Sequence, residues 1–380
     1  MRVEVITDSG TFAGLNRVWN GLLAQSRIHH PFMTHEWLGL WLDSFGERST
    51  PYVMTVVAGS RILAVAPMMV TQTTLYGCPV RRLHGMVNAY SERFDWLLGE
   101  HPSETCRLLW DHLKEPASSW DILEVGQLPA ESALLEFLPP LMESEGYLLG
   151  HWQANHAPYV SVRHSWETYY RSLKKAHRSN LRNHARQLEQ HGLVDLELVT
   201  SHDRLELDIR EALALEAVAW KVRQRTSLKC RRESQGFYQE LLRQAAGEGT
   251  LHLSFLRVNG KRIAVRISLL HDNRLFMLKS GYDERYQRYS PGQVLTERLL
   301  RHAWDAGLEE VDFLGHDERW KQSWATGRRS HTWLFAFPDR MKTRLLHNMK
   351  FRVIPGLRRS TLFPTVQRTI GRLRMPVHGQ

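Results

Sequence analysis

The chain has 380 residues, of which 42% are hydrophobic, and a formal net charge of +10. This length favours two domains, and the apolar fraction is too high for extended disorder. The longest apolar run, residues 62–70, is far shorter than the ~20 residues that span a bilayer, and the N-terminus has no apolar signal core. We therefore expect a soluble, cytoplasmic protein.

The spacing of cysteine and histidine gives no signal for a metal. Cys78, Cys106 and Cys230 lie far apart without a CxxC pair, and the 20 histidines include no HExxH motif. We therefore expect no disulfide framework, no structural zinc and no other bound metal.

Positive charge is concentrated at the C-terminal end. Residues 339–380 contain ten Lys and Arg against a single acid, Asp339. Within 341–359 this charge is accompanied by apolar side chains, namely Leu345, Leu346, Met349, Phe351 and Ile354. We expect this basic extension to bind an anionic partner, either the inner face of the membrane or an acyl-carrier protein. A nucleic-acid-binding tail and a solvated extension are the alternatives.

The first 150 residues alternate between helical and strand periodicity. Helices are predicted over 12–23, 34–45, 104–113 and 131–145, and strands over 3–6, 52–58, 61–70, 73–76 and 121–125. Residues 81–94 are predicted as a loop that is either a solvated connector or a binding segment for an acceptor substrate, with Tyr90 and Asp95 as candidate residues. This mixed order predicts an α/β fold with a central sheet.

A change of character near residue 157 predicts a domain boundary, and a long basic helix follows it. Four cationic side chains recur at every fourth position along this helix: Lys174, Arg178, Arg182 and Arg186. Like charges at this spacing repel, so the stripe requires an anion. We take Lys174, Arg178 and Arg182 as candidate substrate contacts. The alternative is pairing with acidic side chains of the fold, such as Glu189, Glu206 or Glu211.

The second half continues with helices and then an antiparallel sheet. Helices are predicted over 205–221 and 237–246, followed by strands over 251–258, 262–270 and 275–280, with Asn259-Gly260 as a hairpin turn. A helix opens at Ser290-Pro291-Gly292-Gln293, and a strand over 310–314 ends at Gly315. A polar turn follows at once: His316, Asp317, Glu318, Arg319 and Lys321. Polar groups at the carboxyl end of such a strand are typical of an α/β site.

These motifs resemble a known family. The Gly281-Tyr282-Asp283 sequence, Ser290-Pro291-Gly292, and Asp312-Phe313 with Gly315 and Lys321 are similar to the GNAT-related acetyltransferases associated with cellulose and exopolysaccharide biosynthesis. That family is similar in turn to the Fem-type aminoacyltransferases. The resemblance extends over about 31–337 and is clearest over 281–324. It implies two tandem GNAT-like domains, 1–157 and 158–338, before the basic extension 339–380.

The resemblance also implies a donor and an acceptor. The donor is acyl-CoA or an acyl-carrier thioester, and its pyrophosphate is bound at the helix start by Gly292, Gln293 and Val294, with Lys279 as a further candidate. The glycine-rich RxxGxG/A pattern that is usual there is absent. The acceptor is an amine or a hydroxyl, in envelope or exopolysaccharide metabolism, with Tyr282 and Asp283 as candidate contacts.

The polar turn provides the candidate catalytic residues. Lys321 matches a lysine of Fem-like enzymes that acts electrostatically at the reacting group, and an ammonium suits a developing oxyanion. Asp312 and Asp317 could hold a proton or orient an acceptor amine, and His316 has an ordinary pKa near neutrality. The alternatives are an ion pair of Lys321 with Asp317 or Glu318, and a backbone-capping role for Asp312.

No motif for a covalent nucleophile is present, so we expect direct attack by the acceptor. Two alternative functions remain open. One is an aminoacyl-tRNA-dependent transferase, with tRNA as the less favoured carrier, and the other is a non-catalytic, membrane-peripheral scaffold.

Overall fold

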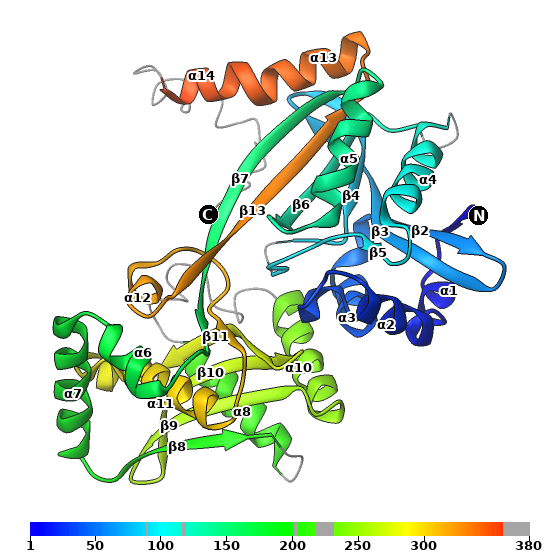
Figure 1. Ribbon diagram of the computed structural model, residues 1–380. Coiled ribbons are helices and arrows are strands. Elements are labelled where there is room, and N and C mark those ends of the chain that lie inside the picture. Colours follow the sequence, from blue (N-terminus) through cyan, green and yellow to red (C-terminus); the bar gives the residue numbers. More distant parts are fainter. Residues whose placement is uncertain (89, 116–118, 201–203, 218–231, 360–380) are drawn as a thin grey trace. The chain divides into compact units, whose positions relative to one another are not determined.

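The computed structural model describes residues 1–88, 90–115, 119–200, 204–217 and 232–359, and they form two compact units (Figure 1). Unit 1 comprises Met1–Ile28, Phe32–Ala154 and the segment from His331 onward, and unit 2 comprises His29–Pro31 and Asn155–Ser330. The chain thus returns to unit 1 after unit 2 is complete, whereas the domains predicted from the sequence, 1–157, 158–338 and 339–380, follow one another in order.

Unit 1 is built on a mixed sheet with the strand order β1-β2-β3-β4-β6-β13-β7, and β5 pairs with β3. Its parallel pair is β4 with β6. The strands are β1 (Arg2–Ile6), β2 (Thr50–Ala58), β3 (Arg61–Leu75), β4 (Cys78–Gly85), β5 (Leu97–Leu98), β6 (Ile122–Pro129), β7 (Leu148–Ser161) and β13 (Gly327–Phe337). Its helices are α1 (Ser9–Ala13), α2 (Asn16–Gln25), α3 (His35–Phe45), α4 (Pro102–Lys114) and α5 (Ala133–Ser144).

Local signals explain most of unit 1. Thr34 caps α3, as expected, by accepting a hydrogen bond from the Trp37 N–H at 3.2 Å. Gly59, with a φ of +61°, makes the β2–β3 turn. The loop predicted over 81–94 is wrong at its start, because residues up to Gly85 pair with β3 as part of β4. The predicted boundary near 157 lies inside the long strand β7.

Unit 2 repeats this plan, with the strand order β7-β12-β11-β10-β9-β8. Its parallel pair is β11 with β12, and α11 connects these two strands. The new strands are β8 (Val194–Val199), β9 (Leu251–Val258), β10 (Lys261–His271), β11 (Arg274–Tyr282) and β12 (Glu310–Asp312). The helices are α6 (Trp166–Ser172), α7 (Lys175–Glu189), α8 (Leu205–Glu216), α10 (Arg232–Gly247), α11 (Pro291–Asp305) and α12 (Arg319–Gln322).

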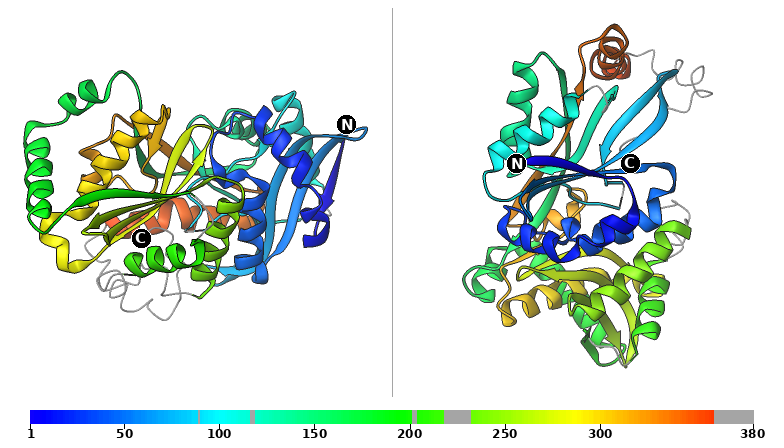
Figure 2. Two further views of the ribbon diagram at one scale, coloured as in Figure 1. Left: turned by 90° about the horizontal axis from the view of Figure 1, so that it is seen from below. Right: turned by 90° about the vertical axis from the view of Figure 1, so that its right-hand side faces the viewer.

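Two helix layers enclose the sheet of unit 2 (Figure 2). On one face, α11 and α7 pack together and bury Leu181, Leu299 and Leu300 against the strands. On the other face, α8 lies against β10 and β11 and also contacts α10. Strands buried on both faces explain the nearly continuous apolar runs of β9, β10 and β11.

The basic helix is interrupted, contrary to the prediction. It divides into α6 and α7 because Leu173 has an extended backbone, with a ψ of 149°, and its side chain is buried in the core of unit 2. Lys174 is therefore the N-cap residue of α7, and only the later arginines lie on the helix itself.

The C-terminal segment folds as α13 (Met341–Asn348), a π-helical turn (Met349–Val353) and α14 (Ile354–Arg359), which form one rod in Figure 1. Leu346 is buried against unit 1, and Phe351 packs beside it. These two apolar residues therefore face the protein, whereas Met341, Leu345 and Val353 are exposed. No helix within the described ranges is both long and apolar enough to cross a bilayer.

Candidate functional site

The candidate site of unit 2 begins where two parallel strands separate. β11 and β12 pair only from Arg274–Glu310 to Phe276–Asp312, after which β12 ends and β11 continues to Tyr282. Beyond this point β11 contains a bulge, because Ser268 and Ile267 of β10 pair with Met277 and Lys279. Bulges of this kind are frequent beside active sites, where they redirect side chains.

The turn after β12 has an unusual backbone that a buried acid holds in place. Leu314 and Gly315 both have positive φ, 53° and 59°, and for leucine this conformation is costly. Asp312 is fully buried, and it accepts a hydrogen bond from the Leu314 N–H at 2.8 Å and from Arg329 at 2.8 Å. Asp312 therefore holds the turn, which corresponds to the capping role that we weighed as its alternative.

The strained turn holds Lys321 on α12. The Lys321 ammonium donates to the Leu314 carbonyl at 2.8 Å and to the His316 carbonyl at 3.2 Å. The Glu318 carboxylate lies 3.5 Å away, so the ion pair with Glu318 is present, but it is longer than the contacts with the carbonyls. A buried ammonium bound to fixed carbonyl oxygens is a well-positioned charge.

The start of α11 lies beside this turn. Gln293 accepts a hydrogen bond from the Trp324 indole at 2.8 Å, which connects the helix to the segment that follows Lys321. The N–H groups of Gln293 and Val294 both donate to the Ser290 carbonyl. Of the three predicted amide donors, Gly292 is the one that does not donate to the Ser290 carbonyl. The Tyr282 side chain lies close to Gly292.

Arg266 on β10 is a site residue that we did not predict. It is only 5% exposed, and it donates to the Gly292 carbonyl at 3.2 Å and to the Thr296 hydroxyl at 2.7 Å. Its guanidinium lies 4.7 Å from the ring centroid of Trp320. The Nε atom of Arg266 is buried and has no hydrogen-bond partner in the part of the chain that the structure describes.

The position of Arg266 is electrostatically unusual. It places a buried cation at the positive end of the α11 dipole, an arrangement that favours a bound anion. Burial lowers the pKa of Arg266 to about 10, so the side chain remains charged at neutral pH. The signal for it in the sequence is a single arginine inside the apolar run 263–270.

Two further polar atoms are buried at this site without a partner among the described residues. One is Oδ1 of Asp317, whose Oδ2 lies 3.3 Å from Arg328. The other is Nε2 of His177 on α7, whose ring packs edge-on against Trp324 at 4.6 Å. Burial lowers the pKa of His177 and so favours the neutral ring. His316 is exposed, and it contributes its carbonyl to Lys321.

Lys279 and Asp283 lie elsewhere in unit 2. The Lys279 ammonium lies 5.5 Å from the centroid of Tyr238 on α10, so it faces the helix layer opposite α11. The cause is the bulge in β11, which shifts the alternation of its side chains. Asp283 caps the short helix that follows β11 and binds Arg285, and this hydrogen bonding lowers the pKa of Asp283.

Tyr90 and Asp95 belong to unit 1. Tyr90 stacks on Phe45 with ring centroids 5.6 Å apart. Asp95 is buried, accepts a hydrogen bond from the Trp96 N–H at 2.8 Å, and has a pKa raised by burial to about 7.

The cationic residues of α7 flank α11. Arg178 is half-buried with an Nε atom that has no partner among the described residues, and Arg182 is exposed. The proposed pairing with Glu206 or Glu211 is wrong for these arginines, because those acids bind Arg243 and Arg262. Glu297 of α11 is instead the acid whose pKa Arg182 influences, although burial raises that pKa.

No group of three or more His, Cys, Asp or Glu residues that could hold a metal ion occurs among the residues placed in the structure. The site therefore combines a helix N-terminus, two buried cations and one unpaired carboxylate oxygen. Such a set can bind an anion and stabilise a developing negative charge.

Known proteins are similar to this chain in one sequence segment and in fold. Residues 175–322 match the family of the acetyltransferase (GNAT) domain. No curated protein sequence matches the chain. Among solved structures, FemX has a TM-score of 0.58 at 10% identity and covers 91% of this chain and 100% of its own.

Two further structures have a similar fold. A C-terminal domain of a putative lysylphosphatidylglycerol synthetase from Agrobacterium fabrum gives a TM-score of 0.52 at 13% identity, over 89% of this chain and 96% of that one. A protein of unknown function from Bacteroides thetaiotaomicron gives 0.53 at 12% identity, over 88% of this chain and 100% of that one. These similarities confirm the predicted mixed α/β fold with GNAT-like units. The acetyltransferase (GNAT) domain matched over 175–322 identifies the chain as an acyltransferase.

Proposed function

We propose that the chain transfers an acyl group from a thioester donor, acyl-CoA or an acyl-carrier thioester, to an amine or hydroxyl acceptor. The observation that carries this proposal is that three elements bring positive charge together. Arg266 of β10 donates to the Gly292 carbonyl in the first turn of α11, and Arg266 and Lys321 lie 4.7 Å and 5.6 Å from the ring centroid of Trp320. All three attract negative charge, which a thioester donor supplies as phosphate and as the oxygen of the reacting carbonyl.

In this proposal the chain's residues divide the chemistry between them. Gly292 and Arg266 bind the donor's phosphates. The Lys321 ammonium exchanges its contact with the exposed Glu318 carboxylate for one with the thioester carbonyl oxygen. The acceptor attacks the carbonyl carbon, its proton passes to Asp317, and the carbon–sulfur bond breaks as the thiolate leaves. Asp312 is a positioning residue, because it holds the turn that aims Lys321.

The acceptor that we propose is anionic and belongs to envelope or exopolysaccharide metabolism. Arg178 and Arg182 lie on α7, which packs against α11, so they offer positive charge beside the site. Two proteins of similar fold are named FemX and a putative lysylphosphatidylglycerol synthetase, and the second name refers to an aminoacylated lipid.

We further propose that the rod α13–α14 contacts an anionic membrane surface. Met341 and Leu345 are 91% and 57% exposed, and Val353 is also exposed. Arg352 is exposed nearby, and the extension 339–380 contains ten Lys and Arg. Apolar side chains among cations suit the surface of an anionic bilayer.

The donor can be identified by calorimetric titration of the full chain with acetyl-CoA, an acyl-carrier protein and aminoacyl-tRNA. We expect acetyl-CoA or the carrier to bind, and Arg266→Met to weaken that binding. If only aminoacyl-tRNA bound, the proposed donor would be aminoacyl-tRNA and not a thioester. If none of the three bound, a non-catalytic scaffold would be favoured.

A further inference from the structure

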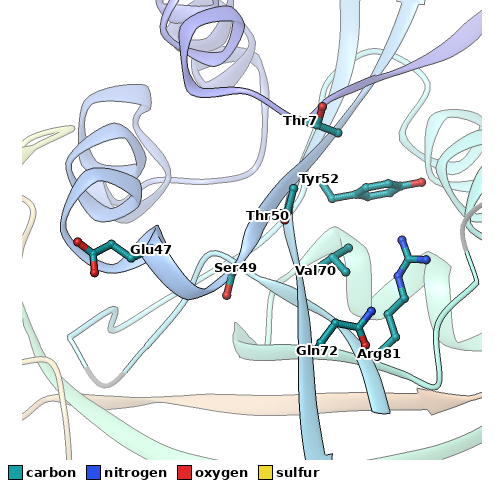
Figure 3. Close-up of a pocket in the computed structure, with 8 residues that line it drawn as sticks. All are labelled: Thr7, Glu47, Ser49, Thr50, Tyr52, Val70, Gln72 and Arg81. Carbon is teal, nitrogen blue, oxygen red and sulfur yellow. The ribbon is translucent and has the colours of Figure 1, made fainter. Parts of the chain in front are cut away.

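Unit 1 contains a cavity that plays no part in acyl transfer as proposed above. It is an open groove of about 600 Å³, lined by Thr7, Glu47, Ser49, Thr50, Tyr52, Val70, Gln72 and Arg81 (Figure 3). Most of these side chains are polar, and the cation among the described side chains that line the groove is Arg81.

The sheet register explains why these residues share one wall. Thr50 of β2 pairs with Val70 of β3, and Gln72 of β3 pairs with Arg81 of β4. Because side chains alternate along a strand, Tyr52 joins this same face. Helix α4 packs against β2 and β3 and ends at Lys114, so the groove lies where the helix no longer covers the sheet.

Arg81 makes the groove suitable for an anion. Its side chain is half-buried, its guanidinium donates to the Ser119 hydroxyl at 3.3 Å, and it forms no ion pair with any acid in the described ranges. The residue opposite it is a neutral amide, Gln72. The Asp121 carboxylate accepts from the Arg81 backbone N–H at 2.9 Å and binds Lys342 at 2.8 Å. A guanidinium beside an amide, with no ion pair of its own, suits a phosphate or carboxylate ligand.

The Ser49 hydroxyl belongs to a chain of polar contacts. Nδ1 of His84 lies 2.9 Å from the Gly85 carbonyl, and Nε2 lies 2.8 Å from the Thr71 hydroxyl. That hydroxyl lies 2.6 Å from the Ser49 hydroxyl. Because a hydroxyl oxygen has two lone pairs, Ser49 can also accept from a ligand hydroxyl.

Tyr52 has a fixed ring. Its hydroxyl lies 3.2 Å from Nε2 of His112, and the two rings stack at 21°. His112 is in turn 3.4 Å from Glu115. The ring therefore forms a rigid apolar wall on the same side of the groove as Arg81 (Figure 3), as in sites that combine apolar area with a few placed polar groups.

We propose that this groove binds a small polyhydroxylated molecule that carries a phosphate or a carboxylate. The oxyanion binds Arg81 and Gln72, the ring of the ligand lies against Tyr52, and its hydroxyls donate to Ser49 and Glu47. The groove is a binding site separate in its chemistry from the acyl-transfer site, because it contains no residue assigned to that reaction.

The test is calorimetric titration of the full chain with four probes: glucose 6-phosphate, glucuronate, glucose and inorganic phosphate. We expect the two anionic sugars to bind, one of them more tightly according to whether phosphate or carboxylate is preferred. Arg81→Gln should lower their affinity about 10-fold or more, since the charge-assisted contact with the oxyanion is lost.

The matched control is Arg61→Gln, which removes an equal charge from β3 at an exposed pair with Glu100 outside the groove. It should leave binding unchanged. Gln72→Leu is a second groove variant at an exposed position, and it should weaken binding by a smaller factor. The proposal is overturned if no probe binds at about 10 mM, if Arg61→Gln and Arg81→Gln act alike, or if phosphate alone binds as tightly as glucose 6-phosphate.

Discussion

Among the residues that the structure describes, two lysines are buried, one in each unit, and their surroundings differ. Lys321 of unit 2 donates to two carbonyl oxygens in a strained turn. Lys350 of unit 1 lies on the π-helical turn, with its ammonium 4.0 Å from the ring centroid of Trp152 and 4.2 Å from that of Phe335.

The difference shows that burial alone does not identify a functional lysine. Carbonyl oxygens fix the direction of the Lys321 charge, and a helix N-terminus, Arg266 and the unpaired Asp317 oxygen lie in the same site. Burial lowers the pKa of Lys350 to about 8, and the attraction of the Glu124 carboxylate offsets only part of this shift. We therefore assign chemistry to Lys321 and a packing role to Lys350.

The largest expected effect separates these two roles directly. Lys321→Met keeps the aliphatic stem but removes the charge, and it should lower the rate of acyl transfer by about 10²–10³-fold, as the loss of an oxyanion donor does. The measurement is thiol release from acetyl-CoA with the best amine or hydroxyl acceptor of a panel. Lys350→Met, which also removes a buried lysine, should retain the rate, and equal losses in both variants would remove the distinction.

Arg266→Met should act on donor binding. The change removes a buried cation from the phosphate end of the site, so the KM for acetyl-CoA should rise about 10–100-fold while kcat changes little. Steady-state kinetics at varied donor concentration measure both values. A fall in kcat with an unchanged KM would place Arg266 outside the donor site.

Lys350→Met should change how stability depends on pH. The pKa of Lys350 falls from 10.5 to about 8 on folding, so its charge destabilises the fold below pH 8, and this cost disappears as pH rises toward 10.5. The free energy of unfolding of Lys350→Met relative to the natural chain should therefore decrease by about 1–3 kcal/mol over this interval. Chemical denaturation at several pH values measures it, and a constant difference would contradict the assigned cause.

The smallest expected effect concerns the exposed side of the rod that carries Lys350. Met341→Ser with Leu345→Ser should lower binding to vesicles rich in anionic lipid about 3–10-fold, because apolar area is lost without a change in charge. Vesicle flotation measures it, with Val18→Ser, another exposed apolar residue of unit 1, as control. If all variants bound neutral vesicles as well as anionic ones, the positive charge would have no part in binding. If the rod bound an acyl-carrier protein and not vesicles, the proposed partner would be the carrier protein and not the membrane.

The parts of the fold that follow local rules could be predicted from the sequence. The Asn259-Gly260 turn, the strands that flank it, and the helix that opens at Pro291 are all present, because turn chemistry and periodicity act over a few residues. The turn that holds Lys321 was located for the same reason, since a strand, a glycine and a polar cluster are adjacent in the chain.

Other features depend on contacts that a linear reading does not contain. The basic helix breaks at Leu173 because that side chain is buried in the core. The Lys279 side chain points away from α11 because β11 contains a bulge. Arg266 is part of the site only because β10 brings it under the first turn of α11. The return of β13 to unit 1 has no signal in its own composition.

The most direct test of the central assignment observes the reacting carbonyl itself. Acetyl-CoA with a ¹³C-labelled thioester carbonyl should show a downfield shift of that resonance when bound to the natural chain, because the Lys321 ammonium polarises the carbonyl oxygen. The shift should persist with Lys350→Met and disappear with Lys321→Met, although the donor remains bound. A bound donor whose carbonyl resonance is the same in all three proteins would contradict the role of Lys321.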